Sequence, residues 1–132
     1  MEGMAEPVAT PVDRSNPQKS DFLRYALDLY NHHYFWESHV YFEALWNAHQ
    51  RMGSEAEFFK GFIKLGAAGV KLTIDQEVSA RGHFERAKEL FLVVQKDEGD
   101  FFLGFDIKNI IQKIDEELKG KIECFEIYPG WD

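Results

Sequence analysis

Cysteine and basic residues are both scarce in this chain of 132 residues. Cys124 is the single cysteine, so no intrachain disulfide can form, and a lone thiol suits a reducing compartment. The 15 Lys and Arg residues are outnumbered by 23 Asp and Glu residues, which gives a net charge of −8. Proteins that bind nucleic acid need a basic surface to neutralise phosphates. The composition therefore excludes a disulfide scaffold and argues against nucleic acid as a partner.

Long hydrophobic runs are missing as well. The most apolar stretch, residues 58–70, is interrupted by Lys60 and Lys64 and is shorter than the roughly 20 residues that a bilayer-spanning helix needs. The first residues are acidic, whereas an export signal begins with a basic segment and continues with an apolar one. We therefore expect a cytoplasmic protein that has no membrane partner.

Apolar residues are nevertheless abundant, at 45% of the chain, and 12 of them are Phe. A core of this size supports one folded domain without a metal or a disulfide. Three of the four prolines lie in the first twenty residues. We expect residues 1–20 to form a flexible arm, either mobile or lying across the domain or a partner chain. The helical domain should span residues 21–120, and residues 121–132 should form an extended tail packed on it.

The spacing of the apolar residues predicts an all-α fold, a compact single-domain bundle of about five helices. The first helix should be capped by Ser20 or Asp21, and its inward face should consist of Phe22, Tyr25, Ala26, Leu29 and Tyr30. A capping box at Ser54 and Glu57 should begin the third helix. The other helices are predicted near residues 35–50, 77–96 and 106–119.

The second predicted helix is apolar on almost every side, so we expect it at the centre of the bundle. The third contains Gly61, Gly66 and Gly69, and each glycine costs about 1 kcal/mol relative to alanine in an exposed helix. Three such costs predict that a neighbouring element, with the indoles of the second helix as candidates, approaches this helix closely.

One stretch is rich in side chains that can do chemistry. Four of the five histidines, His32, His33, His39 and His49, lie within eighteen residues. On a helix, His39 and Glu43 are one turn apart and share a face. An imidazole and a carboxylate that are shielded from water can bind a divalent metal or act as an acid–base couple. A metal would need a further ligand, for which Glu37, His32, His33 and His83 are the candidates.

Three interpretations follow. In the first, His39 and Glu43 form a buried structural hydrogen bond, and the protein is a non-catalytic module that binds itself or an unidentified protein. In the second, the same pair serves a metal-dependent or acid–base enzyme of hydrolase type. In the third, a small-molecule pocket lies between the second and third helices, lined by Trp36, His39, Glu43, Trp46, Gly61 and Lys64. A nucleophilic role for Cys124 is disfavoured because no base lies near it in the sequence.

The sequence also resembles a known family. Residues 35–46 read F-W-E-S-H-V-Y-F-E-A-L-W, which resembles the motif E-A-H-E-x-x-E-x-L-W of domain-of-unknown-function family 309, small helical proteins of prokaryotes and plastid-bearing lineages. Residues 60–68, K-G-F-I-K-L-G-A-A, resemble its Q-G-L-I-Q-L-A-A-A segment, and residues 102–106, F-L-G-F-D, resemble its Y-L-G-I-D turn. The resemblance implies an all-helical single domain and no particular reaction.

The departures from the family motifs concern polar positions. Val40 replaces the glutamate that usually follows the motif histidine, and Lys60 and Lys64 replace two glutamines. A polar site built from these positions would therefore lack one carboxylate and two amides in this chain.

Overall fold

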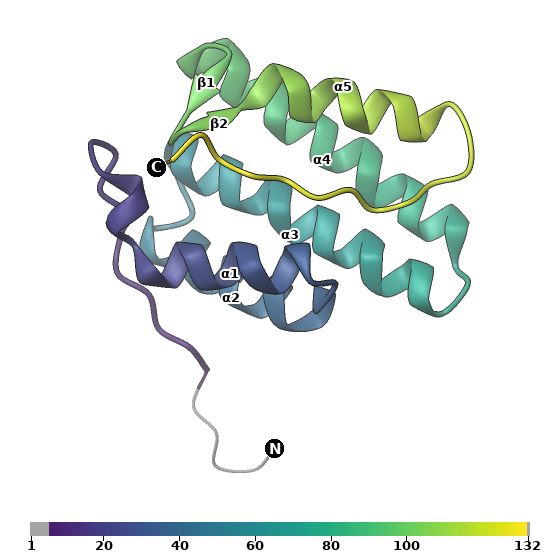
Figure 1. The fold of residues 1–132 in the computed structure, drawn as a ribbon, viewed down its shortest axis with the longest axis horizontal. Coiled ribbons are helices and arrows are strands. Elements are labelled where there is room, and N and C mark those ends of the chain that lie inside the picture. The colour runs from purple at the N-terminus through teal and green to yellow at the C-terminus, as the bar shows by residue number, and fades with distance from the viewer. Residues whose placement is uncertain (1–5, 132) are drawn as a thin grey trace.

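The computed structural model of the protein describes residues 6–131, and the predicted all-α fold is confirmed (Figure 1). The elements, in chain order, are η1 (Pro17–Lys19), α1 (Asp21–Asn31), α2 (Phe35–Ala48), α3 (Gly53–Thr73), α4 (Glu77–Glu98), β1 (Phe101–Phe102), β2 (Phe105–Asp106) and α5 (Ile107–Leu118). The two short strands pair antiparallel and form the turn that leads into α5. None of the helices described has the length and hydrophobicity needed to span a membrane.

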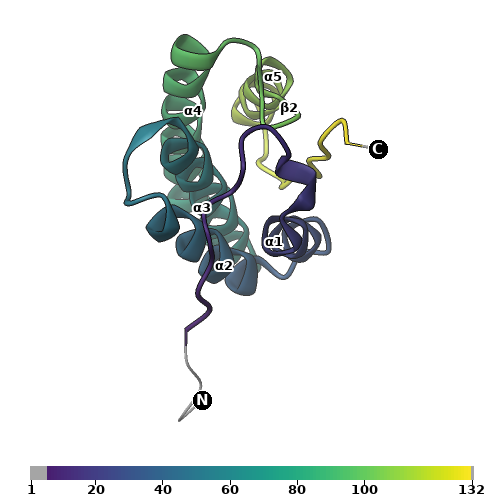
Figure 2. The ribbon, with the colours of Figure 1, turned by 90° about the vertical axis from the view of Figure 1, so that its left-hand side faces the viewer.

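The helices form two layers, which Figure 2 shows end-on. One layer consists of α2, α3 and α4, with α3 in the middle, and the other contains α1 and α5. The expectation that the second helix is central is therefore wrong, because α3 is packed against helices on both sides while the outer side of α2 faces solvent. Trp36 on that outer side is 63% exposed.

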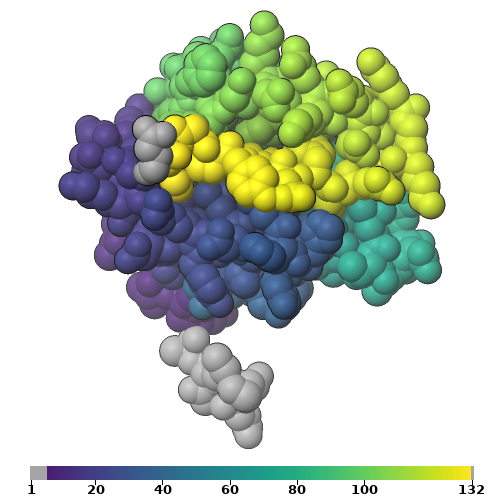
Figure 3. Space-filling view, in the orientation of Figure 1, coloured from purple at the N-terminus to yellow at the C-terminus, as the bar shows by residue number. Residues whose placement is uncertain are grey.

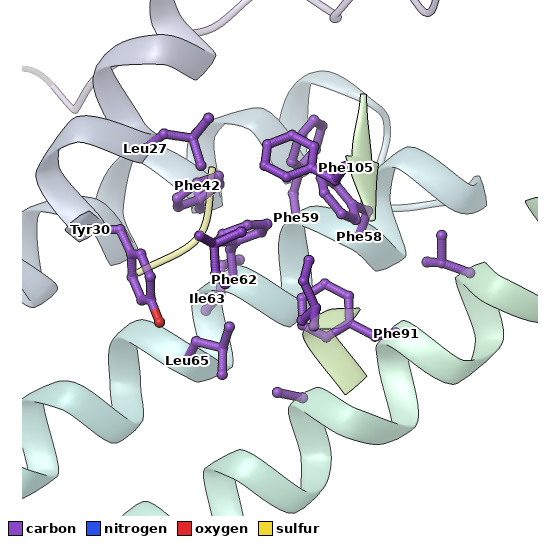
Figure 4. Packing of buried hydrophobic residues seen from close by; sticks show 14 of the residues in the cluster. Leu27, Tyr30, Phe42, Phe58, Phe59, Phe62, Ile63, Leu65, Phe91 and Phe105 are labelled. Atoms are coloured by element: carbon purple, nitrogen blue, oxygen red, sulfur yellow. The ribbon is translucent and has the colours of Figure 1, made fainter. Parts of the chain in front are cut away.

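An aromatic cluster connects the two layers (Figure 4). Phe62 of α3 stacks on Phe42 of α2, with ring centroids 4.6 Å apart. Phe58, one turn earlier on α3, packs against Phe105 of β2 at 5.0 Å and against Phe91 of α4 at 5.8 Å. All five rings are fully buried. The abundance of Phe in the sequence thus has a direct structural use, since α3 carries the rings that every neighbour contacts.

The first helix begins as predicted, and its buried face only partly matches the predicted one. The Ser20 hydroxyl accepts a hydrogen bond from the Leu23 N–H and so caps the helix. The buried residues are Leu23, Ala26, Leu27 and Tyr30. Tyr25 is exposed and packs edge-on against Tyr41 of α2. The prediction is thus correct for Ala26 and Tyr30 and wrong for Tyr25, because the apolar residues of this helix outnumber the positions that can face the core.

The start of α3 is also different from the prediction. The helix begins at Gly53, and no side chain caps it, so the predicted capping box is not formed. The side chain of Glu55 in its first turn instead accepts hydrogen bonds from Arg14, at 2.7 and 3.0 Å. The first turn of α3 is therefore held by a tertiary contact through Glu55 and not by a side-chain cap.

The glycines of α3 do allow close packing, but against phenylalanines rather than indoles. A Cβ atom on Gly61 would lie 2.6 Å from Cζ of Phe91, and one on Gly69 would overlap the ring of Phe35. At Gly66 the neighbours are the carbonyl oxygen of Phe35 and the hydroxyl of Ser38, both at 3.3 Å. Gly61 therefore allows α4 to pack closely against α3, and Gly66 and Gly69 allow α2 to do so.

Residues 122–131 are extended and run between α1 and α5, as the space-filling view shows (Figure 3), and Cys124 of this segment lies against Leu65 of α3. The Tyr30 hydroxyl donates a hydrogen bond to the carbonyl of Phe125. The Asn31 side chain both donates to the carbonyl of Ile127 and accepts from its N–H, each at 2.9 Å. The indole N–H of Trp131 donates to the Leu103 carbonyl in the β-turn. This segment therefore joins the two helices of the second layer.

The amino-terminal arm lies across the domain from Val12 onward, which is one of the two arrangements that the sequence left open. Val12 and Pro17 are buried. The Val12 N–H donates a hydrogen bond to Nε2 of His49 at 2.9 Å. Arg14 forms ion pairs with Glu55 of α3 and Glu98 of α4. Residues 1–5 of the predicted arm and residue 132 of the predicted tail lie outside the described residues.

Candidate functional site

The residues that the sequence singled out lie on the outer face formed by α2 and α3, which we call the α2–α3 face. His39 projects from α2 toward α3 and is half-buried. Its ring stacks on that of Trp36, with centroids 5.6 Å apart and planes 23° apart. The Nδ1 atom of His39 is buried and has no hydrogen-bond partner among the described residues. Its imidazole is thus held by packing and not by a polar partner.

The predicted buried hydrogen bond between His39 and Glu43 is wrong. Glu43 is exposed, and no hydrogen bond joins the two side chains in the part of the chain that the structure describes. The reason is the position of α2 at the edge of its layer, because this turns residue 43 toward solvent. Burial lowers the pKa of His39, the carboxylate of Glu43 raises it and the ammonium of Lys64 lowers it, with a net shift downward.

His39 and Glu43 separate two shallow depressions. The first, of about 250 Å³, lies on the outer side of α2 and is lined by Trp36, Val40 and the arm residue Pro7. The second, of about 220 Å³, lies between α2 and α3 and is lined by Trp46, Lys60, Ile63 and Lys64. The Lys60 ammonium lies 5.6 Å from the centroid of the Trp46 ring. The face is therefore aromatic and carries both signs of charge.

Most of the predicted binding residues meet here. His39, Glu43, Trp46 and Lys64 line the second depression, and Trp36 lines the first. Gly61 does not, because it faces Phe91 on the opposite side of α3. The pocket expected between the second and third helices is thus a shallow hollow on the surface.

The predicted metal ligands do not come together. No group of three His, Cys, Asp or Glu side chains within residues 6–131 is arranged to hold a metal ion. Glu37 is exposed on α2, and His32 and His33 lie at the turn that follows α1. His83 lies on α4, where burial and then Lys64 and Lys71 lower its pKa. The candidate further ligands therefore lie on three different elements, which are α2, the turn after α1, and α4.

Cys124, in the carboxyl-terminal segment, is half-buried next to α3, with its thiol 4.0 Å from the Leu65 carbonyl. Burial, together with the charge of Glu117, raises its pKa to about 12. The thiol is therefore neutral near pH 7, which agrees with the expectation that it is not a nucleophile.

A larger concavity than these two depressions lies elsewhere, and the sequence did not point to it. It has a volume of about 640 Å³ and lies at the end of the bundle where residues 33–35, 69–77 and 121–124 meet. Of its lining residues, His33 and Cys124 had been considered, but only separately. No periodic pattern could have joined these three segments, because His33 and Cys124 lie at opposite ends of the helical domain in the sequence and only the tertiary fold brings them together.

Comparison with known proteins gives one match. The model of the family described as domain of unknown function (DUF309) matches residues 23–82. No curated protein and no solved structure matches the chain. The matched residues run from α1 into α4 and include every α2 and α3 residue of the α2–α3 face. The arm residues Glu6 and Pro7 and the turn at residues 102–106 lie outside them. Within residues 23–82, the chain is similar to the DUF309 family of domains of unknown function.

Proposed function

We propose that the protein is a non-catalytic binding module that associates with a second copy of itself through the α2–α3 face. One observation carries the proposal: this face presents Glu43 beside Lys60 and Lys64, and none of the three has an ion-pair partner within the described chain. A surface with unpaired charges of both signs is complementary to a copy of itself.

In a dimer with a twofold axis, the contact between Glu43 and the lysines of the partner would occur twice. In an isologous dimer the same patch on both protomers forms the contact. If residue i of the first copy contacts residue j of the second, then residue j of the first copy also contacts residue i of the second. If α2 of one protomer lies over α3 of the other, Glu43 of each copy approaches the lysines of its partner. Two symmetric sets of ion pairs result from a single geometry.

Trp36 supplies the apolar part of the contact. Its indole is 63% exposed and is fixed by stacking on His39, so its burial costs little side-chain entropy. Tryptophan is among the residues that contribute most at protein interfaces, and burying a large apolar side chain contributes about 2 kcal/mol. The depression beside it can receive an aromatic or aliphatic side chain of the second copy.

The net charge of −8 per chain opposes association of two copies. At an ionic strength of 0.15 M, however, the Debye length is about 8 Å, so charges far from the contact are screened more strongly than pairs across it. Association is therefore expected at this ionic strength and is best measured there.

Sedimentation equilibrium over a range of protein concentrations tests the proposal. We expect a concentration-dependent dimer for the wild type. Glu43→Lys and Lys64→Glu should each weaken dimerisation by at least about tenfold, because every dimer contains the contact twice. An equimolar mixture of the two variants should dimerise like the wild type, since the reversed charges then face each other. Trp36→Ala should also weaken the dimer without unfolding the chain, because this residue is exposed.

Glu116→Lys is the matched control, because Glu116 is exposed on α5, in the other layer. This reversal should leave the dimer unchanged. A wild type that stays monomeric at millimolar concentration would refute self-association. A mixture of Glu43→Lys and Lys64→Glu proteins that associates no better than either alone would refute the α2–α3 face as the contact.

A further inference from the structure

The groove of about 640 Å³ at the end of the bundle shares no lining residue with the α2–α3 face. It is the right-hand end in Figure 1, where the turn between α1 and α2, the last turn of α3 and the first residues of the carboxyl-terminal segment converge. Its volume lies within the roughly 300–1,000 Å³ that is usual for small-molecule sites. The groove is therefore large enough to hold a ligand and is independent of the proposed dimer contact.

The floor of the groove is apolar. Phe35, Leu72 and Ile122 form it, together with Gly69. A Cβ atom on Gly69 would occupy the space of the Phe35 ring, so the glycine lets this ring lie directly on α3. The ring of His33 stacks on the ring of Phe35, with the ring centroids 5.2 Å apart and the ring planes 19° apart. A flat or aliphatic ligand body would find aromatic and aliphatic surface here.

The rim of the groove is acidic. It carries the carboxylates of Asp75, Glu77 and Glu123 and the single ammonium of Lys121. None of these four side chains forms an ion pair within residues 6–131. Glu77 accepts a hydrogen bond from the Ile122 N–H and so also holds the carboxyl-terminal segment in place. Asp75 and Glu123 make no hydrogen bond through their side chains in this part of the chain, and their carboxylates are exposed.

We propose that this groove binds a small organic cation, an amine with an apolar body of alkyl or aryl type. The apolar floor accounts for the body, and the excess of carboxylates over ammonium groups on the rim accounts for the positive charge. An anion of the same shape would meet three like charges against one opposite charge. Each contact of the cation with a rim carboxylate gains a favourable Coulomb energy near the protein surface.

Three probes that share one apolar body separate the contributions of shape and charge. They are 4-phenylbutylamine, 4-phenylbutanol and 4-phenylbutyrate, each titrated into isotope-labelled protein while backbone amide shifts are followed by NMR. We expect the amine to bind at least about tenfold more tightly than the carboxylate, with the alcohol between them. The largest shifts should fall on residues 69–77 and 121–124, which line the groove.

Two rim variants test the charge directly. Asp75→Asn and Glu123→Gln should each weaken binding of the amine severalfold and leave binding of the alcohol unchanged. Neither change threatens the fold: Asp75 has φ +58°, which asparagine adopts readily, and Glu123 is exposed. Asp97→Asn, an exposed site near the other end of α4, is the matched control and should have no effect.

Equal affinity for the amine and the carboxylate would overturn the proposal, and so would the failure of all three probes to bind. Shifts that fall outside the groove would overturn it as well. Groove amides that shift on raising the protein concentration without any probe would show that a second copy occupies the groove, which also contradicts the proposal. The charge-reversal variants of the α2–α3 face should bind the amine like the wild type, so failure of one proposal leaves the other intact.

Discussion

A methyl group added at Gly61 should destabilise the fold, whereas the same methyl group added at Gly82 should stabilise it. Both glycines lie inside helices, α3 and α4, so replacement by alanine improves helix propensity by about 1 kcal/mol at either position. What differs is the space around the new atom. A Cβ atom on Gly82 meets nothing within 4 Å, whereas one on Gly61 lies 2.6, 2.8 and 2.9 Å from three atoms of the Phe91 ring.

The magnitude follows from these distances. Carbon atoms prefer separations of about 3.5–4.0 Å, so the Phe91 ring must move by roughly 1 Å to admit the methyl group. Phe91 is fully buried between Phe58 and Phe62, and overpacking of such a core costs about 1–3 kcal/mol. We expect Gly82→Ala to raise the free energy of unfolding by about 1 kcal/mol and Gly61→Ala to lower it by about 1 kcal/mol.

Urea denaturation followed by circular dichroism measures the difference. With a denaturant dependence of about 2 kcal/mol per molar urea, the midpoints of the two variants should differ by about 1 M. Combining Gly61→Ala with Phe91→Leu should cost at least about 1 kcal/mol less than the sum of the single changes, because the smaller side chain leaves room for the methyl group. Equal stability of Gly61→Ala and Gly82→Ala would refute the packing argument.

Three further predictions concern the segments that cross the surface. Burial lowers the pKa of His49, and its neutral Nε2 accepts a hydrogen bond from the Val12 N–H. The contribution of His49 to the free energy of unfolding should therefore be fully present above pH 6.5 and should be lost as the pH falls toward the folded-state pKa. Urea midpoints at pH 7.5 and 5.5 should differ less in His49→Gln than in the wild type. Asn31→Ala should cost about 2 kcal/mol, because two hydrogen bonds to Ile127 are lost, and amide exchange should accelerate in residues 122–131. Cys124, with its pKa raised from 9.0 to about 12, should react with iodoacetamide about a thousandfold more slowly at pH 8 in the folded protein than in urea; equal rates would contradict its burial.

The sequence predicted best those helices that have a single apolar face. In α4 the apolar residues with heptad-like spacing, Ala80, Phe84, Ala87, Phe91 and Val94, are all buried. In α5 the isoleucines that share one helical face, Ile107, Ile110, Ile111 and Ile114, are buried too, and Asp106 caps the helix through its side chain. A regular spacing of this kind leaves only one orientation in which the apolar residues avoid water, so local information is sufficient.

Helices with apolar residues on several faces could not be oriented in this way. Both α2 and α3 carry more apolar side chains than one face can hold, and the sequence does not say which of them has neighbours on both sides. The glycines of α3 were the informative signal, because a helix that tolerates Gly61, Gly66 and Gly69 must be approached closely. They indicated a neighbour without identifying it as Phe91 or Phe35.

The orientation of the candidate site could not be predicted from the sequence either. A separation of four residues on a helix places His39 and Glu43 on one face, and the structure agrees that both line the same depressions. Whether that face looks inward depends on the packing of α2 at the edge of its layer, which is a tertiary property. The hydrogen bond expected between them required burial of both groups, and Glu43 is exposed.

The segment that ties α1 to α5 is also the part of the described chain that leaves the ribosome last. Until it emerges, the Tyr30 hydroxyl and the Asn31 amide lack their acceptors and donor, which lie 95 and 96 residues further along the chain. The second layer therefore closes only after translation has passed residue 127. A nascent chain that pauses earlier leaves Phe84 of α4 and Phe105 of β2 without the rings of Phe125 and Trp131, which pack on them edge-on in the folded protein.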